Sequence, residues 1–413
     1  SIDNLITEKV TEMKGEKGGT QKAKTLSKSI DRLQRQAMTI RDRRLIDFLA
    51  QKVVIPKYGF PVDVASLDIW TPQSTDGANI DLSRDLQIGI LDFAPGARTV
   101  ANKRLWEANG LRIPSDKALP EFHWRICKDC DTFRTLKDAG IDTGCEVCGS
   151  VEVRPQYRPA IIPTFGFLGK PSEEKPGESR PPKIGSLRSF FTEFSGQPPE
   201  EETVLIGSSQ VGVRVGKEGL ISVINQGPRN AGFEVCLNCG GAQLPTRKAV
   251  SRTSAGQFKS HKRPGHSDHE CKTIMKTLVL GHQFRTDAIE VQLPGRVSYE
   301  SGESVLAALL AATQQFDIPR DDVKGTTRAS EGGQGRSLVI YDAVPGGAGY
   351  ARALRDALPK LFKEASRIVR ECSCGEETSC YGCLRSYSNQ FVHDSLSRRA
   401  ATDVFTTLGI AES

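Results

Sequence analysis

The chain has 413 residues, of which 38% are hydrophobic and 26% are charged, and its formal net charge is +6. This composition excludes a wholly disordered chain, because disorder requires low hydrophobicity together with high net charge. The length favours two or three domains, and no apolar run reaches the roughly 18 residues of a membrane-spanning helix.

Residues 1–52 are predicted to form a basic helical connector, with twelve Lys or Arg against seven Asp or Glu. A 4-3-4-3 spacing of apolar residues predicts one buried helical stripe, made of Leu26, Ile30, Leu33, Ala37 and Ile40. We interpret it as a surface helix docked on a core, the alternative being a basic strut along a nucleic-acid backbone. The N-terminus lacks the form of a secretory signal and an initiator Met, so we expect a cytoplasmic protein and a piece of a longer chain.

Three further regions follow along the chain. Residues 53–168 are predicted to be a β-rich domain, with a strand at 85–93, and residues 169–200 a linker rich in Pro and charge. Residues 201–413 begin with strands at 203–207, 211–215, 220–225 and 233–236. Helices at 302–316, 350–369 and 392–408 and a strand at 337–344 complete this region. The expected fold class is a multidomain α+β protein, with an N-terminal helix, a β-rich region containing a zinc ribbon and a C-terminal α/β module.

Eleven cysteines are the most informative feature of the composition. An odd number leaves an unpaired thiol in any disulfide scheme, and nothing marks the chain as secreted, so reduced thiols are expected. The first cluster has two CxxC pairs separated by fourteen residues: Cys127, Cys130, Cys145 and Cys148. Two such turns facing each other supply the four thiolates of a structural zinc site, and an iron–sulfur centre is the alternative.

The last cluster is tighter and has the spacing CxC, five residues, CxxC. Its members are Cys372, Cys374, Cys380 and Cys383. This spacing predicts a self-contained zinc knuckle between two helices.

The middle cluster contains Cys236, Cys239 and Cys271, with glycines after the second thiol that permit a tight turn. The candidates for a fourth ligand are His261, His266 and His269, and we favour His269 because one turn presents it together with Cys271. One alternative is three buried cysteines beside a solvated loop without metal. A catalytic zinc ion with one position open to water would also need an acidic residue nearby as a base, and no Glu or Asp stands out in that role. All eleven cysteines are then used, which predicts about three Zn²⁺ ions.

A glycine-rich turn joins a strand to a helix at YDAVPGGAGYARAL (341–354). Gly346 and Gly347 could present amides to a phosphate, but the spacing matches no nucleotide-binding motif, and close strand-to-helix packing is the alternative. Asp342 is either a metal or proton ligand or the cap of the next turn. The chain contains neither a Walker lysine motif nor a DEAD/DEAH box, so ATP hydrolysis by the P-loop route requires a motor outside it.

Cations and aromatic rings flank the last cysteine cluster. They offer charge and ring faces to a strand of nucleic acid, and a solvated helix face is the alternative. The residues are Arg385, Arg398 and Arg399, with Tyr381, Tyr387 and His393.

Several segments together resemble the C-terminal zinc-binding module of MrfA-type DEAD/DEAH-box helicases. They are YDAVPGGAGY (341–350), CSCGEETSCYGCLRSYSNQF (372–391), HDSLSRRAA (393–401), GHQFRTDAIEV (281–291) and VCLNCGG (235–241). VIPKYGFPVDVASL (54–67) and LSRDLQIGILDFAPGARTV (82–100) are similar to segments that follow the motor in large bacterial relatives. The resemblance covers roughly residues 45–405 and is most specific over 281–400.

The resemblance implies that the last four cysteines bind one zinc ion, as in MrfA-like proteins. The first two clusters depart from the short MrfA form and suggest the longer relatives found in phage-defence systems such as Druantia and DISARM. The chain would then be the C-terminal accessory region of a superfamily-two helicase or translocase in DNA repair or antiviral defence. Its expected partners are DNA, motor domains in cis or in trans and other defence or repair subunits, with no membrane.

Two other functions compete with this interpretation. One is a metal-dependent nuclease or hydrolase that uses Asp287, Glu290 and Asp342, although three residues of separation place the first two on opposite faces of a strand. The other is a scaffold that binds only proteins. We expect no catalytic residue in this chain.

Overall fold

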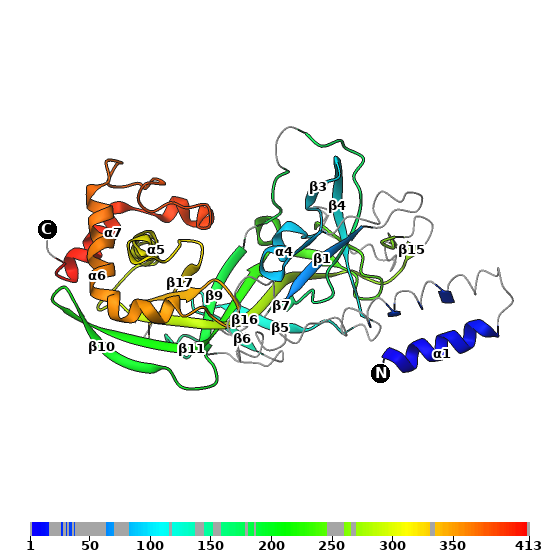
Figure 1. Ribbon diagram of the computed structural model, residues 1–413, viewed down its shortest axis with the longest axis horizontal. Coiled ribbons are helices and arrows are strands. Elements are labelled where there is room, and N and C mark those ends of the chain that lie inside the picture. Colours follow the sequence, from blue (N-terminus) through cyan, green and yellow to red (C-terminus); the bar gives the residue numbers. More distant parts are fainter. Residues whose placement is uncertain are drawn as a thin grey trace.

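The computed structural model describes residues 2–15, 63–69, 82–114, 118–136, 144–151, 158–177, 181–185, 187–245, 260–265, 270–330 and 335–410, with six positions between 26 and 37. Among them, no helix combines the length and apolar character needed to cross a bilayer. Helix α1 (Ile2–Lys14) lies at one end of the molecule and the C-terminal helices at the other (Figure 1). The predicted stripe is confirmed at Leu26, Ile30, Leu33 and Ala37, which are helical and buried, whereas Ile40 lies outside the described residues.

The smaller sheet has five strands and lies in the middle of the view in Figure 1. In spatial order they are β2 (Ser83–Asp85), β1 (Val64–Ile69), β8 (Phe167–Pro171), β4 (Arg104–Leu111) and β3 (Arg98–Ala101). β1 and β8 are parallel, and the other pairs are antiparallel. Helix α4 (Leu86–Asp92) follows β2 directly and packs against this sheet.

The larger sheet has eleven strands and draws on both expected domains. From the first region come β5 (Glu121–Ile126), β6 (Phe133–Leu136) and β7 (Arg158–Ile161). The remaining strands are β9 (Leu187–Phe194), β10 (Glu200–Ile206), β11 (Ser209–Asn225), β12 (Phe233–Val235), β13 (Ala242–Gln243), β16 (Lys276–Gln292), β17 (Val323–Ala329) and β18 (Arg336–Asp342). The sequence predicts residues 187–194 as part of the linker. They form strand β9 instead, which pairs with β11.

Two long antiparallel strands, β11 and β16, hold the larger sheet together. A bulge between Gly216 and Gly219 divides their pairing into two halves. Before the bulge β11 pairs with β10, and after it with β9. Bulges bend a strand and redirect its side chains, so one continuous strand serves two cores. Val213 of the first half packs under the C-terminal helices, whereas Ile221 of the second half packs in the core shared with the smaller sheet.

Three helices cover the first half of the larger sheet: α5 (Tyr299–Ala312), α6 (Tyr350–Glu371) and α7 (Arg398–Thr407). Short 3₁₀ segments lie at Pro228–Asn230, Thr313–Phe316 and Gln390–Ser395. Ser298 begins α5 by accepting the amide hydrogen of Ser301 at 3.0 Å. In α6, Leu354, Leu358 and Leu361 recur at helical spacing and are fully buried.

The sequence predicts most of these elements, but the strand expected at 85–93 is wrong. Residues 86–92 form α4 instead, with Leu86 and Ile90 buried and Ile88 42% exposed. A strand would have placed all three side chains on one face, whereas helical spacing separates Ile88 from the other two. Gly89 lets the helix approach Ala65 of β1, because an added Cβ would lie 3.3 Å from the Ala65 Cβ.

The carboxylate of Asp342 holds the start of α6. The helix begins after Gly349, which has no side chain to cap it. Asp342, at the end of β18, accepts hydrogen bonds from the backbone amides of residues 348–351, with distances of 2.6 Å from Gly349 and 2.7 Å from Ala351. The predicted capping role is therefore confirmed. An anion at a helix N-terminus also compensates the helix dipole.

Replacing Asp342 by Asn should destabilise the C-terminal module by about 2 kcal/mol, because the new NH₂ group opposes amide donors. We expect a lower midpoint of urea unfolding, measured by circular dichroism. The matched control is Asp356→Asn on the exposed face of the same helix, which should leave the midpoint unchanged. Equal midpoints for the two variants would contradict the capping role.

Candidate metal centres

Three groups of potential ligands converge in the described part of the chain. In each group the four ligand atoms lie within 4.8 Å of one another. The groups are Cys127, Cys130, Cys145 and Cys148; Cys236, Cys239, His261 and Cys271; and Cys372, Cys374, Cys380 and Cys383. Four thiolates, or three thiolates and an imidazole, are the ligand sets of structural zinc sites. The expectation of three zinc sites is thus confirmed.

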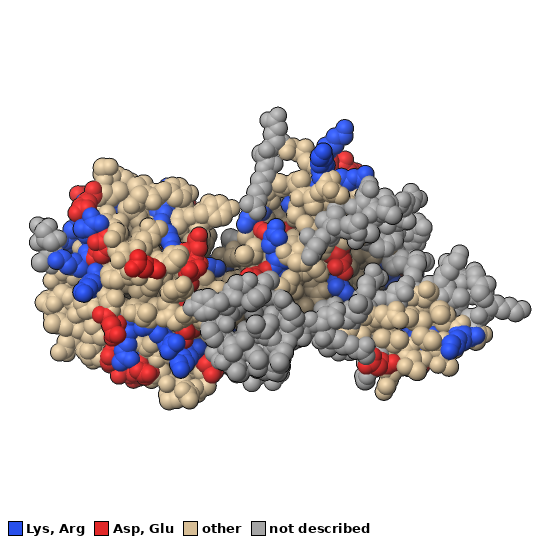
Figure 2. All heavy atoms as spheres, viewed as in Figure 1, with Lys and Arg blue, Asp and Glu red and all other residues tan. Residues whose placement is uncertain are grey.

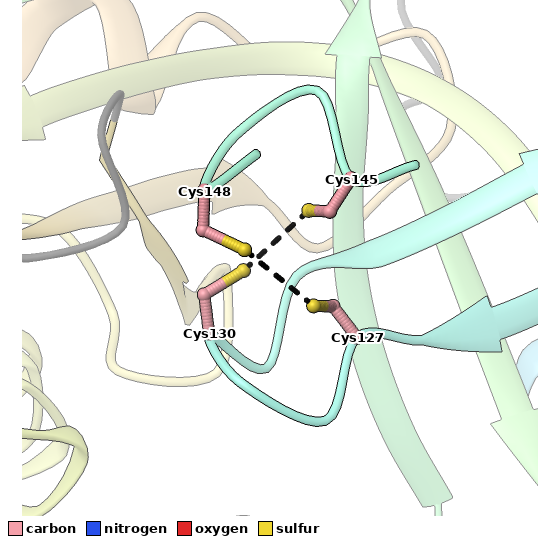
Figure 3. A group of neighbouring side chains, drawn as sticks. All are labelled: Cys127, Cys130, Cys145 and Cys148. Carbon is pink, nitrogen blue, oxygen red and sulfur yellow. Dashed lines mark hydrogen bonds between the residues drawn. The ribbon is translucent and has the colours of Figure 1, made fainter. Parts of the chain in front are cut away.

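In the first cluster, two turns point their thiols at a common centre from opposite sides (Figure 3). The Sγ atoms of Cys127 and Cys148 are 3.7 Å apart, and those of Cys130 and Cys145 are also 3.7 Å apart. A tetrahedral zinc ion with bonds of about 2.3 Å requires sulfur–sulfur separations of about 3.8 Å. The geometry therefore fits a zinc ion without rearrangement.

The CxxC turns at 127, 145 and 236 share one backbone pattern. In each, the residue after the second cysteine has a left-handed conformation, and its amide donates to the carbonyl of the first cysteine at 2.8–3.0 Å. These residues are Asp131, Gly149 and Gly240, with φ of 58°, 71° and 80°. Gly240 is required sterically as well, because a Cβ there would lie 2.2 Å from the carbonyl oxygen of Leu111. The tight turn predicted after Cys239 is confirmed.

The second cluster combines such a turn with a small hairpin. β14 (His261–Lys262) pairs with β15 (Glu270–Cys271), and His261 lies directly opposite Cys271. Residues opposite each other on antiparallel strands project from the same face. His261 Nε2 thereby lies 3.1 Å from Cys239 Sγ, and Cys271 Sγ lies 3.8 Å from Cys236 Sγ.

The structure thus brings His261, one of the three candidate histidines, into this group. His269, the favoured fourth ligand, and His266 lie outside the described residues, so the choice of His269 stays a prediction. The sequence argument preferred proximity along the chain to Cys271. Cross-strand pairing instead brings together ligands ten positions apart, a relation that spacing alone did not reveal.

The third cluster closes the end of α6. Cys372 caps the helix, and its Sγ lies 3.5 Å from Cys374 and 3.6 Å from Cys380. The Sγ atoms of Cys374 and Cys383 are 3.7 Å apart. This compact arrangement agrees with the predicted knuckle between two helices.

Burial and backbone hydrogen bonds act in opposite directions on these thiols. Burial raises the pKa of one thiol in each cluster to about 12: Cys130, Cys239 and Cys383. Amides of Ser150 and Cys374 lower the pKa of Cys148 and Cys372 to about 7. A divalent cation favours the deprotonated form of all four ligands, so it offsets the cost of burying several thiolates together.

The cationic residues proposed to bind nucleic acid occupy different environments. Arg398 is only 9% exposed, and its guanidinium donates to the carbonyls of Val369, Arg370 and Cys374. The side chain thus binds the end of α6 and the third cluster, and its contact with nucleic acid stays a prediction. Arg399 is exposed and paired with Glu376 and Glu377.

The remaining nucleic-acid candidates also differ in what they can offer. Arg385 Nε donates to Ser379 Oγ at 2.9 Å, whereas Tyr387 is 67% exposed. The amides of Gly346 and Gly347 donate to the carbonyls of Arg285 and Val344. The helix start beyond them is taken by Asp342, so this turn supports close packing rather than phosphate binding.

The carboxylates considered for a nuclease are committed to other contacts. Glu290 is fully buried between Arg214 and Arg328, at 3.3 and 3.1 Å. Asp287 lies 2.8 Å from Arg352, and burial raises its pKa. Within the described residues, none of these carboxylates joins a group of three or more potential metal ligands. The arrangement gives the nuclease hypothesis no support.

Sequence reasoning missed Phe391 as a surface feature. It is 48% exposed, alongside Tyr381 at 62% and Tyr387 at 67%. Across the described residues, the exposed large aromatic side chains all lie in this segment next to the third cluster. The signal available in the sequence was an aromatic residue directly after the polar run Ser388, Asn389 and Gln390.

Metal analysis should give three zinc ions per chain. Removing one ligand from a cluster (Cys130→Ala, Cys271→Ala or Cys383→Ala) should lower the zinc content of the soluble protein to two. Each lost site removes on the order of 10 kcal/mol of folding free energy from its surroundings. Ser150→Ala, beside Cys127 but not in the ligand set, is the control and should retain three ions. Three ions in the cysteine variants would contradict the assignment.

The choice of histidine can be decided separately. His261→Ala should lose one zinc ion or release it much faster to a colorimetric chelator, because the imidazole completes the second cluster. His266→Ala and His269→Ala serve as matched controls and should behave as the unmodified protein does. Fast release from His269→Ala alone would reverse the assignment.

Comparison with known proteins identifies the C-terminal part of the chain. Residues 306–384 match the family described as MrfA Zn-binding domain. The chain is 21% identical to the Druantia protein DruE of Escherichia coli (strain UMEA 4076-1) over 406 residues. That match covers 88% of this chain and 22% of DruE, so the chain spans about a fifth of that protein's length.

Among solved structures, the chain resembles the DUF1998 helicase MrfA bound to DNA, with a TM-score of 0.39 and 10% identity. That match covers 88% of this chain and 38% of the other. MrfA without DNA gives a TM-score of 0.33 at 10% identity, covering 83% and 34%. The third cluster begins and ends inside the segment that matches the MrfA Zn-binding domain, so this cluster is similar to the zinc-binding module of that family.

Proposed function

We propose that this chain is the zinc-stabilised C-terminal accessory region of a superfamily-two ATP-dependent DNA helicase or translocase. It binds nucleic acid and the motor domains, in bacterial antiviral defence or DNA repair. The observation that carries the proposal is the MrfA-type module at 306–384, which contains all four ligands of the third cluster. The similarity to DruE, a Druantia protein, supports the defence setting.

Zinc has a structural role in this proposal. Each cluster holds together chain segments that have little hydrophobic core of their own. A closed zinc site with four protein ligands stabilises a fold and leaves no open position to activate water. The three centres would keep the accessory region rigid while the motor supplies ATP hydrolysis. Motor domains in cis or in trans and other subunits of the same system are the proposed protein partners.

The face shown in Figure 2 carries no broad basic surface among the described residues, since Lys and Arg are interspersed with Asp and Glu. DNA binding would therefore depend on a limited number of phosphate contacts. Such contacts release counterions, and the binding constant falls with salt by about 0.7–0.9 logarithmic units per contact for each decade of concentration.

DNA binding can be measured by fluorescence anisotropy over a series of KCl concentrations. We expect a logarithmic slope of about −2 or steeper, from a few phosphate contacts. Cys383→Ala, which disrupts the third cluster, should weaken binding, whereas the control Ser150→Ala should not. A flat salt response, or no binding, would reject the DNA-binding part. Co-purification of partners that survives nuclease treatment would then favour a protein scaffold.

A further inference from the structure

The segment that carries the exposed aromatic rings lies next to the smaller-sheet domain. The ring of Tyr387 is 5.9 Å from Nζ of Lys183. Lys183 also lies 3.4 Å from Asp92 at the end of α4. This lysine therefore connects the third-cluster segment with the domain that contains α4. Figure 2 shows the surface hollowed between these two parts of the molecule.

A cavity of about 360 Å³ is lined by the end of α4, by β3 and by Lys183. Three cations, Arg84, Arg98 and Lys183, and a single carboxylate, Asp92, contribute to its lining. Asp92 lies 3.9 Å from Arg84, and Arg98 pairs with Glu107 at 3.7 Å and with the exposed Glu174 at 2.7 Å. Ion pairs at this level of exposure are weak, so an incoming phosphate can compete for these cations.

The third-cluster segment, whose Tyr387 faces Lys183, carries exposed rings. Tyr381, Tyr387 and Phe391 expose between 48% and 67% of their surface. Their segment is held rigidly, because His393 Nε2 lies 3.0 Å from the carbonyl of Ser386 and Asn389 donates to the carbonyl of Leu384 at 2.8 Å. Rigid exposed rings beside cations match the chemistry of unpaired nucleic acid, which has free base faces and a phosphate at every nucleotide.

We propose that an unpaired nucleic-acid strand lies in this cleft, with its bases stacked on Tyr387 and Phe391 and its phosphates near Lys183 and Arg84. The proposal rests on the function proposed above and specifies its ligand as a single strand. A duplex is a poorer ligand here, because its bases are already stacked on one another. Base stacking on aromatic side chains is largely independent of sequence, so little sequence preference is expected.

The test compares binding of a single-stranded and a duplex oligonucleotide to the full chain. Tyr387→Ala and Phe391→Ala should each weaken single-strand binding about tenfold and change duplex binding little. Tyr387→Phe keeps the ring and should restore the affinity. Lys183→Gln should reduce the salt slope by about 1. Quenching of 2-aminopurine in the strand should disappear in the double Ala variant.

Leu205→Ala and Ile274→Ala are the matched controls, because both side chains are 61% exposed and lie elsewhere. They should leave binding unchanged, and three zinc ions per chain should verify folding of every variant. If the unmodified chain binds no nucleic acid, the proposed function fails. If it binds but Tyr387→Ala and Phe391→Ala keep its affinity for the single strand, the cleft proposal alone is overturned.

Discussion

The structure depends on the convergence of cysteine thiols on three centres. Buried thiolates repel one another and lose hydration, so each tetrad is stable only around a cation. In the first two clusters the ligands also connect segments that are separated in the sequence. The second cluster, for example, joins the turn after β12 to the β14–β15 hairpin. Metal ligation thus replaces hydrophobic packing at the places where strands are short and loops are long.

The first zinc cluster also connects the two expected domains. Ala329 of β17 packs directly against its cysteines, and Arg336 of β18 lies 3.3 Å from Asp131, the left-handed residue of the first turn. The cluster comes from the first region, whereas β17 and β18 lie in the segment that matches the MrfA Zn-binding domain. Loss of the first zinc ion would consequently affect the module that contains the third.

The position of the third cluster explains why the aromatic segment is exposed yet ordered. Arg398 binds three carbonyls around this cluster and the end of α6, and the tetrathiolate fixes the chain on both sides of the knuckle. Because the zinc ligands hold this segment, its aromatic side chains are not needed to form a core and can face the solvent. Tyr387 and Lys183 meet where this segment approaches the smaller-sheet domain, and the proposed strand would lie beside this contact.

The sequence by itself determined the features that depend on local spacing. A CxxC turn is a short-range structure with its own hydrogen bonds, so the cysteine ligands could be assigned without knowing the fold, and the amphipathic pattern of α6 likewise fixed its buried face. Tertiary structure decided what depends on distant partners. His261 came close to Cys239 through pairing across a hairpin, β5–β7 joined the larger sheet through β16, and residues 86–92 became helical against β1. Arg398 is a further example. The sequence does not show whether a charged side chain faces solvent or, as Arg398 does, binds backbone carbonyls.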